Sequence, residues 1–255
     1  MIGSLLNAFR MFSRLPVPKA EWNEKNKSYM LCFFPLVGVV SGIFLILWYQ
    51  LCDVLCMDGI IFGAGAVAIT VLVTGGIHLD GFCDVSDARA SWGDRQKKLE
   101  ILDDPHIGAF AAIKLGVYLV IYAALLSVTE SISTVLIVSC GYVFSRSLSG
   151  LTAIAFRTAK NGGMLYSFTK PADKKITAAV LIFIGILSCC GMIASDAAAG
   201  TAAVAAAFLT VVYYRFTAYR EFGGISGDLA GWFLQLCELF ITAAAVFVYS
   251  IKEVI

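Results

Sequence analysis

Seven long apolar stretches recur along this chain, and they constrain its fold more than any other feature. They lie at roughly 31–51, 59–78, 107–129, 132–154, 176–195, 198–215 and 230–251. Runs of about 20 apolar residues are what a helix needs to cross the hydrocarbon core of a bilayer. With 15% charged residues and a mean hydropathy of +0.83, the chain is too apolar for a soluble domain. We therefore predict an all-α polytopic membrane protein with about seven transmembrane helices, within a range of six to eight, as a single integral membrane domain over residues 1–255.

The first residues have a different pattern, in which apolar side chains recur at helical spacing. These are Ile2, Leu5, Leu6, Phe9 and Phe12. The pattern predicts a short N-terminal amphipathic helix that packs on the spans or lies along the bilayer surface. The prolines of the following SRLPVP segment should end this helix, because proline cannot continue it.

Basic residues alternate between the loops and so predict the orientation. Segments 1–30, 79–106, 155–175 and 215–229 hold sixteen of the nineteen Lys and Arg residues, whereas loops 52–58, 130–131 and 196–197 hold none. Cytoplasmic loops are normally the basic ones. We expect a multi-pass protein of the cell (inner) membrane with a cytoplasmic N-terminus. The net charge of +1 gives no indication of nucleic-acid binding.

Residues 74–89 read TGGIHLDGFCDVSDAR and carry the strongest chemical signal, three carboxylates at the end of an apolar run. On a helix the spacing of Asp80, Asp84 and Asp87 brings them to one face, where a cation would offset their repulsion. Oxygen ligands suit Mg²⁺, which also binds substrate phosphates. Each aspartate alone could be an ordinary solvated loop residue. However, segment 79–106 holds seven acidic against four basic residues, a net charge of −3, which is unusual for a cytoplasmic loop.

Other polar residues are candidates for substrate binding. Arg146 and Glu238 lie inside apolar spans, where an ionisable group indicates either a functional site or a buried structural ion pair. Arg157 and Lys160, beside the following glycine pair, could contact phosphate. His78 could orient a ligand or simply end its span. Asp228 follows three glycines, and it could cap a helix or bring a fourth carboxylate to the first three, as a metal or general-base site would require.

Several of these segments together resemble the cobalamin 5′-phosphate synthase family, also called adenosylcobinamide-GDP ribazoletransferases. The resemblance is carried by TGGIHLDGFCDVSDA, LEILDDPHIGAF, FSRLPVP with FFPLVGVVSG, and GGISGDLAGWFLQLCE, and it spans nearly the whole chain. It implies a membrane enzyme that uses Mg²⁺ to join adenosylcobinamide-GDP to α-ribazole or α-ribazole 5′-phosphate, with release of GMP. LDDPHIG departs from the MKDSR pattern of that family, although Asp104 matches the family aspartate.

The chemistry of this reaction assigns roles to the residues. We expect Asp80 and Asp84, with Asp87 as a third ligand, to bind Mg²⁺ on the pyrophosphate. Asp87 or Asp104 would accept the ribazole hydroxyl proton, and Arg146 or Arg157 would contact phosphate, while His78 and Asp228 also bind substrate. The spaced aspartates also resemble the CDP-alcohol phosphotransferases, which are the alternative enzyme class. A transporter is a further alternative, but its polar residues should gather at the membrane centre rather than at the cytoplasmic end. The oligomeric state stays open, and membrane lipid is an expected partner.

Overall fold

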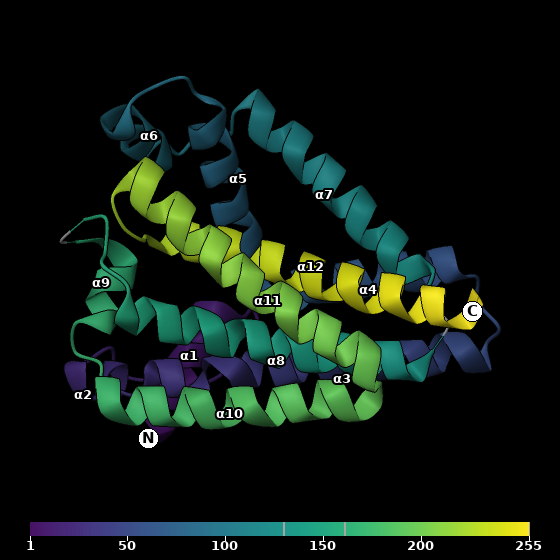
Figure 1. Ribbon diagram of the computed structural model, residues 1–255. Coiled ribbons are helices and arrows are strands. Elements are labelled where there is room, and N and C mark those ends of the chain that lie inside the picture. The colour runs from purple at the N-terminus through teal and green to yellow at the C-terminus, as the bar shows by residue number, and fades with distance from the viewer. Residues whose placement is uncertain (130, 161, 255) are drawn as a thin grey trace.

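The computed structural model describes residues 1–129, 131–160 and 162–254, and within these ranges the chain is almost entirely helical (Figure 1). The elements in chain order are α1 (Ile2–Phe12), α2 (Glu24–Lys27), η1 (Met30–Phe33), α3 (Phe34–Val54), α4 (Gly59–Thr74), α5 (Ile77–Ala90), α6 (Arg95–Leu102), α7 (Ala109–Ser127), α8 (Ile132–Ala155), α9 (Gly163–Thr169), α10 (Lys174–Ser195), α11 (Ala197–Thr217), the π-helix η2 (Ala218–Phe222) and α12 (Gly227–Val254). The predicted all-α fold is confirmed.

Six helices in the described part of the chain are long and apolar enough to cross a membrane, or seven if the bent pair α4 and α5 counts as one span. This agrees with the prediction of six to eight spans. The second span was expected to run to residue 78, but α4 ends at Thr74 and α5 leaves it at an angle of 97°. The turn is made by Gly75 and Gly76, whose φ angles of 67° and 77° are in the left-handed region that favours glycine.

Small residues allow the membrane helices to pack closely. A side chain at Gly38 of α3 would fall 2.4 Å from the backbone oxygen of Tyr142 in α8, and one at Gly200 of α11 would fall 2.2 Å from that of Met192 in α10. Small residues at helix interfaces let backbones approach in this way inside a bilayer. The helices α10 and α11, which follow each other directly, therefore form a tightly packed hairpin.

The predicted N-terminal amphipathic helix is α1, and it is packed on the protein. Ala8 and Phe12 are buried against the core, and the backbone N–H of Arg14 donates to the oxygen of Val73 at 2.9 Å. The N-terminal segment is thus fixed beside the end of α4. It forms part of the wall at the end of the bundle where the chain bends into α5.

The acidic segment 79–106 folds largely as α5 and α6; in Figure 1 α6 and the start of α7 lie at the top, and α5 runs from there down to α12. A cluster of charges ties this part to the body. Glu221 of η2 accepts from Lys98 at 2.7 Å and from Arg89 at 3.1 Å. The Arg89 guanidinium also lies 5.7 Å from the ring of Tyr213 and 5.2 Å from that of Trp232. The carboxylates of α5 are therefore held in a defined position.

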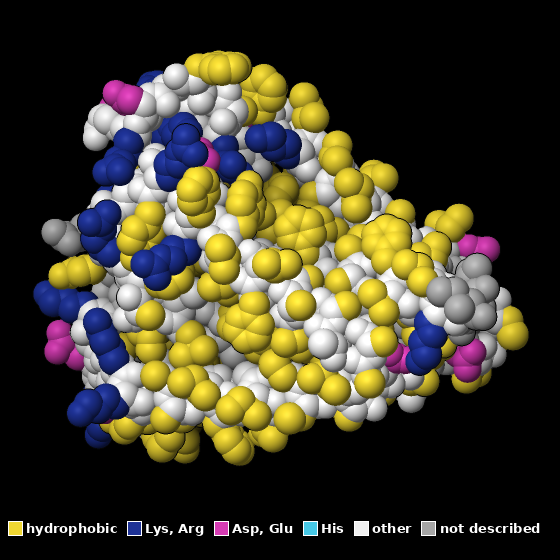
Figure 2. All heavy atoms as spheres, viewed as in Figure 1, with side chains coloured by type: hydrophobic (Ala, Val, Ile, Leu, Met, Phe, Trp, Pro, Cys, Tyr) yellow, Lys and Arg dark blue, Asp and Glu magenta, His cyan; other side chains and the backbone are white. Residues whose placement is uncertain are grey.

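Lysine and arginine side chains gather at one end of the molecule. Figure 2 shows them along the end that carries α2, α6 and α9, whereas few lie at the opposite end near the C-terminus. The loops that are rich in Lys and Arg in the sequence therefore lie together at this end of the molecule. The cytoplasmic location of that end stays a prediction.

Candidate active site

Helices α5 and α12 cross at glycines, and this crossing brings distant carboxylates together. A Cβ atom at Gly81 would lie 2.6 Å from the backbone oxygen of Asp228, and one at Gly231 would lie 3.1 Å from that of His78. Because neither position carries a side chain, the two backbones can touch. Asp228 is thereby placed close enough to Asp84 for its charge to act on it. Asp228 therefore lies near Asp80 and Asp84, and its role as a metal or base residue stays a prediction.

The segments before α9 and before α12 are joined by a short backbone pairing. Thr158 and Ile225 form an isolated parallel bridge, in which the N–H of Ile225 donates to the oxygen of Arg157 at 2.9 Å and the N–H of Ala159 donates to the oxygen of Ile225 at 2.8 Å. A side chain at Gly224 would collide with the oxygen of Arg157 at 2.5 Å. The glycine turn therefore allows the two connections to lie side by side.

The start of α12 differs from the sequence interpretation. Asp228 was considered as the helix cap, but the hydroxyl of Ser226 takes this position and accepts from the N–H of Leu229 at 3.2 Å. The Ser226 hydroxyl also donates to the Asp228 carboxylate at 3.3 Å. Ser226 holds the cap position because α12 begins at Gly227, one residue before Asp228. The carboxylate of Asp228 is therefore available to face the space beside α5.

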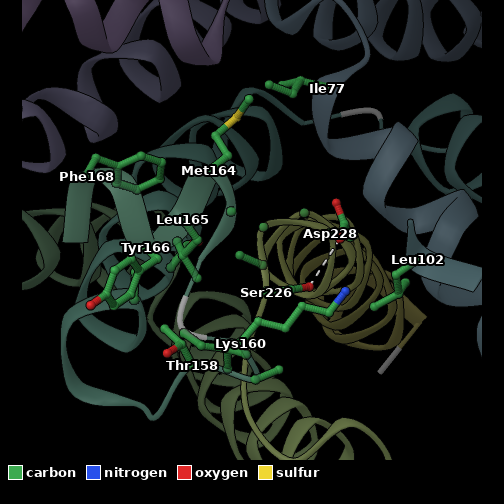
Figure 3. Close-up of a pocket in the computed structure, with 18 of the residues that line it drawn as sticks. Ile77, Leu102, Thr158, Lys160, Met164, Leu165, Tyr166, Phe168, Ser226 and Asp228 are labelled. Atoms are coloured by element: carbon green, nitrogen blue, oxygen red, sulfur yellow. Dashed lines mark hydrogen bonds between the residues drawn. The ribbon is translucent and has the colours of Figure 1, made fainter. Parts of the chain in front are cut away.

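That space is a cavity of about 460 Å³ enclosed by α1, α5, α6, α9 and the ends of α8 and α12 (Figure 3). One end is polar and includes Asp80, Asp103, Thr158, Lys160, Ser226 and Asp228. The other end is mainly apolar and includes Met11, Phe12, Leu31, Phe34, His78, Ser149, Gly150, Ala153, Leu165, Tyr166 and Phe168. A mostly apolar pocket with a few convergent polar groups is the usual form of a small-molecule site.

A lysine lies among the acids at the polar end. In Figure 3 the Lys160 side chain extends toward the start of α12. Its ammonium group forms an ion pair with Asp103 and lies 3.5 Å from the backbone oxygen of Leu99. Asp103 was noted in the sequence only as a departure from the family pattern. Its contribution to the cavity could not be recognised there, because the contact joins residues 57 positions apart.

His78 lies in the wall of the cavity and is nearly fully buried, with 6% of its surface exposed. Its ring centroid is 5.8 Å from that of Phe34. Its Nδ1 atom has no hydrogen-bond partner within the described part of the chain. This nitrogen is itself buried, so its missing partner is a cost to the fold, while the rest of the ring belongs to the cavity wall.

The three aspartates of α5 are spread along the helix. From Asp80 to Asp87 the rise is roughly 10 Å at about 1.5 Å per residue. Accordingly, the described residues contain no group of three or more His, Cys, Asp or Glu side chains placed to hold a metal ion. Mg²⁺ needs fewer protein ligands, because it usually keeps waters and binds through one or two carboxylates and substrate phosphates. A site that uses the carboxylates of Asp80 and Asp84 and is completed by the substrate is compatible with this finding.

The Asp87 carboxylate binds to the start of α7 rather than facing the cavity. Its carboxylate accepts from the backbone N–H of Gly108 at 2.5 Å and from that of Ala111 at 2.8 Å. These N–H groups belong to the first turn of α7, where helical donors have no partners in their own helix. Asp87 thus caps α7 from α5, and it is not among the residues that line the cavity. Its predicted roles as metal ligand and base stay untested.

Residues 4–246 match the model of the family described as cobalamin-5-phosphate synthase. The chain belongs to the cobalamin-5-phosphate synthase family. It is 40% identical to an adenosylcobinamide-GDP ribazoletransferase of Lachnoclostridium phytofermentans, over 96% of this chain and 94% of the relative. Proteins of the same name from Clostridium botulinum and Treponema denticola are 30% and 31% identical, over 94% and 97% of this chain and 95% and 98% of theirs. No solved structure matches the chain.

In this member of the family Arg146 lies in the interior between α8 and α12. Its guanidinium donates to the Glu238 carboxylate and to the backbone oxygen of Tyr142, both at 2.7 Å. Neither Arg146 nor Glu238 lines the cavity. The geometry therefore favours the structural ion pair, one of the two readings of the sequence, over a phosphate contact.

Two further predicted residues lie outside the cavity wall. Arg157 donates to the backbone oxygen of Gly223 at 3.1 Å and 2.8 Å, which fixes the turn before α12. Asp104 is exposed and accepts from the backbone N–H of His106 at 2.9 Å. This hydrogen bond and the contact with the His106 ring lower the pKa of Asp104. Neither residue is among those that line the cavity.

Proposed function

We propose that this chain joins adenosylcobinamide-GDP to α-ribazole or α-ribazole 5′-phosphate and releases GMP, in late cobalamin assembly. The family membership and the names of its relatives support this reaction. The structural observation that carries the proposal is the convergence of Asp80, Asp228 and Lys160 on one cavity. Such a set combines groups that can accept a proton with a cation that can bind phosphate, as transfer between phosphate esters requires.

We assign the metal site to Asp80 and Asp84, with Asp228 beside them. Mg²⁺ bound there would neutralise charge on the pyrophosphate. Asp80 is exposed and lines the cavity, whereas Asp84 follows one helical turn later on the same face of α5, is half-buried and is not among the lining residues. Asp87 would support the site indirectly, because it fixes α5 against the start of α7.

The base that accepts the ribose hydroxyl proton must face the acceptor substrate. In the reaction a ribose oxygen forms a bond to the phosphorus attached to cobinamide, and the bond from that phosphorus to GMP breaks. The hydroxyl proton must leave the ribose oxygen. Asp228 lines the cavity and is oriented by Ser226, whereas Asp87 and Asp104 lie outside it. We therefore move the base role from those two residues to Asp228.

Lys160 is assigned to the phosphates. Its ammonium group lies at the polar end with Asp103 as its partner. The pair keeps the lysine extended across the cavity while no phosphate is bound. An incoming pyrophosphate would compete with Asp103 for this charge. We also place this end of the molecule in the cytoplasm and the protein in the cell membrane, because the basic loops gather there.

The test is to incubate the purified protein in lipid nanodiscs with adenosylcobinamide-GDP, α-ribazole and Mg²⁺. Equal amounts of adenosylcobalamin and GMP are expected by chromatography. A parallel reaction with α-ribazole 5′-phosphate should give adenosylcobalamin 5′-phosphate if that is the acceptor. Failure of both acceptors, together with turnover of a CDP-alcohol and a lipid acceptor, would instead support the alternative enzyme class.

A further inference from the structure

The apolar end of the cavity is built from aromatic rings. Phe12, Phe34 and Phe168 come from α1, α3 and α9, and each is less than 10% exposed. The ring centroids of Phe12 and Phe34 are 4.2 Å apart, and Phe168 meets Phe12 edge to face at 6.0 Å. Rings in such arrangements offer both faces and edges to another aromatic group.

The opposite wall is formed by small residues. Ser149, Gly150 and Ala153 of α8 line the cavity, and Ala230 and Gly231 of α12 continue the wall. The short side chains of Ser149, Ala153 and Ala230 leave room beside them, whereas Gly150 and Gly231 face Leu181 of α10 and the backbone of His78. The result is a site suited to a flat group, with the polar end only a short distance beyond it.

Size decides which substrate can enter. A cavity of about 460 Å³ is within the range that encloses one drug-sized molecule. Adenosylcobinamide-GDP combines a corrin macrocycle, an adenosyl group and a nucleotide, so the whole donor is far too large. α-Ribazole, a ribose with one bicyclic base, has the right size.

Polarity decides between the bases of the two substrates. Among the described residues, His78, Ser149 and Tyr166 are the polar side chains at the apolar end. Guanine carries several donors and acceptors, and burial without partners would be costly. Dimethylbenzimidazole in ribazole has one free ring nitrogen and two methyl groups. A single imidazole such as that of His78, which lies in the wall of the cavity, matches that requirement.

We propose that the cavity is the binding site of the acceptor nucleoside, with the benzimidazole base between the three phenylalanines and the α8 wall. The ribose then lies at the polar end beside Asp228. This inference rests on the proposed function, since it names the part of that active site that holds α-ribazole. The corrinoid donor stays outside and extends only its pyrophosphate to Asp80 and Lys160.

The test is calorimetric binding of α-ribazole to the purified protein without corrinoid and without Mg²⁺. Ala153→Leu adds volume to the α8 wall of the cavity, and Phe168→Leu removes an aromatic face. Each should weaken binding about tenfold or more, a loss of about 1.4 kcal/mol. Phe183→Leu is the matched control, because Phe183 lies on α10 with 62% of its surface exposed, and it should bind as the unaltered protein does.

Steady-state kinetics provides the second measurement. In the variants the KM for α-ribazole should rise, while the KM for adenosylcobinamide-GDP stays within about twofold. The inference is overturned if GMP displaces α-ribazole from the cavity, or if Ala153→Leu raises only the donor KM. Failure of the proposed function can be told apart from failure of this inference. Binding of α-ribazole without any formation of cobalamin would refute the reaction and leave the binding site intact.

Discussion

The guanidinium of Arg146 and the carboxylate of Glu238 form an ion pair of 2.7 Å between α8 and α12, with side-chain exposures of only 1% and 2%. The hydroxyl of Ser145 also lies 3.4 Å from the same carboxylate. The pair is therefore nearly removed from solvent and joins two long helices of the bundle. Because the two charged groups bind each other and neither residue lines the cavity, the pair takes no part in the proposed chemistry.

Removing one partner of this pair should destabilise the protein. Arg146→Met leaves the Glu238 charge buried without its counter-charge, which costs about 3–5 kcal/mol in comparable pairs. Thermal unfolding of the detergent-solubilised protein should show the loss. The double variant Arg146→Met with Glu238→Met removes both charges, and its stability should return most of the way. A stable Arg146→Met protein with a selectively raised KM for the donor would restore the phosphate-binding hypothesis.

The sequence predicted the helices of this fold well, because hydropathy and length report burial in a bilayer directly. The expected spans 132–154 and 198–215 agree closely with α8 and α11. The bend after Thr74 was missed, since an apolar run does not show where a chain changes direction. Gly75 and Gly76 were the available signal.

The site was predicted in part. Asp80, Asp228 and His78 were chosen for their residue type and their position near the ends of spans, and all three line one cavity. The neighbours of Asp87 were not foreseeable, because its hydrogen bonds join α5 to α7 across 21 and 24 residues. The aromatic end was missed because phenylalanines in an apolar chain carry no individual signal.

Asp87→Ala should mainly loosen the start of α7. Loss of a helix cap costs about 0.5–2 kcal/mol, and Asp87→Asn should cost less because its amide oxygen can still accept one N–H. We expect lower thermal stability with at most a moderate loss of activity. Activity lost by orders of magnitude at unchanged stability, with a shifted Mg²⁺ requirement, would instead establish Asp87 as a ligand.

The metal site is tested by Asp80→Asn and Asp84→Asn. These changes keep size but remove charge, so the variants should insert normally and lose activity by orders of magnitude. Partial recovery at raised Mg²⁺ or with Mn²⁺ is expected, because a missing ligand lowers metal affinity. Asp94→Asn is the control, since asparagine can replace the Asp94 cap of α6. Near-normal turnover of the first two variants at limiting Mg²⁺ would contradict the assignment.

Asp228 and Asp104 provide a direct comparison of the two candidate bases. Asp228→Asn should lower kcat about 10²- to 10⁴-fold, the usual contribution of general-base catalysis, without rescue by metal. Asp104→Asn should leave the activity and its pH profile nearly unchanged. The lowered pKa of Asp104 means that it is already ionised throughout the neutral range and loses its charge only as the pH falls below that pKa. If stopped assays from pH 5 to pH 9 showed instead that Asp104→Asn loses activity and Asp228→Asn keeps it, the base would be Asp104.

Orientation can be tested with one native and one introduced cysteine. Cys56 is exposed in the loop between α3 and α4, whereas Trp92 is fully exposed between α5 and α6. We use this loop because Glu130, in the other short loop at that end, lies outside the described residues. In variants that keep a single cysteine, a membrane-impermeant maleimide should label Cys56 in intact cells, because loop 52–58 holds no basic residue and is expected outside. Trp92→Cys should react only after permeabilisation. The opposite pattern would place the cavity, with Asp80 and Asp228, on the external face, where the proposed cytoplasmic reaction could not occur.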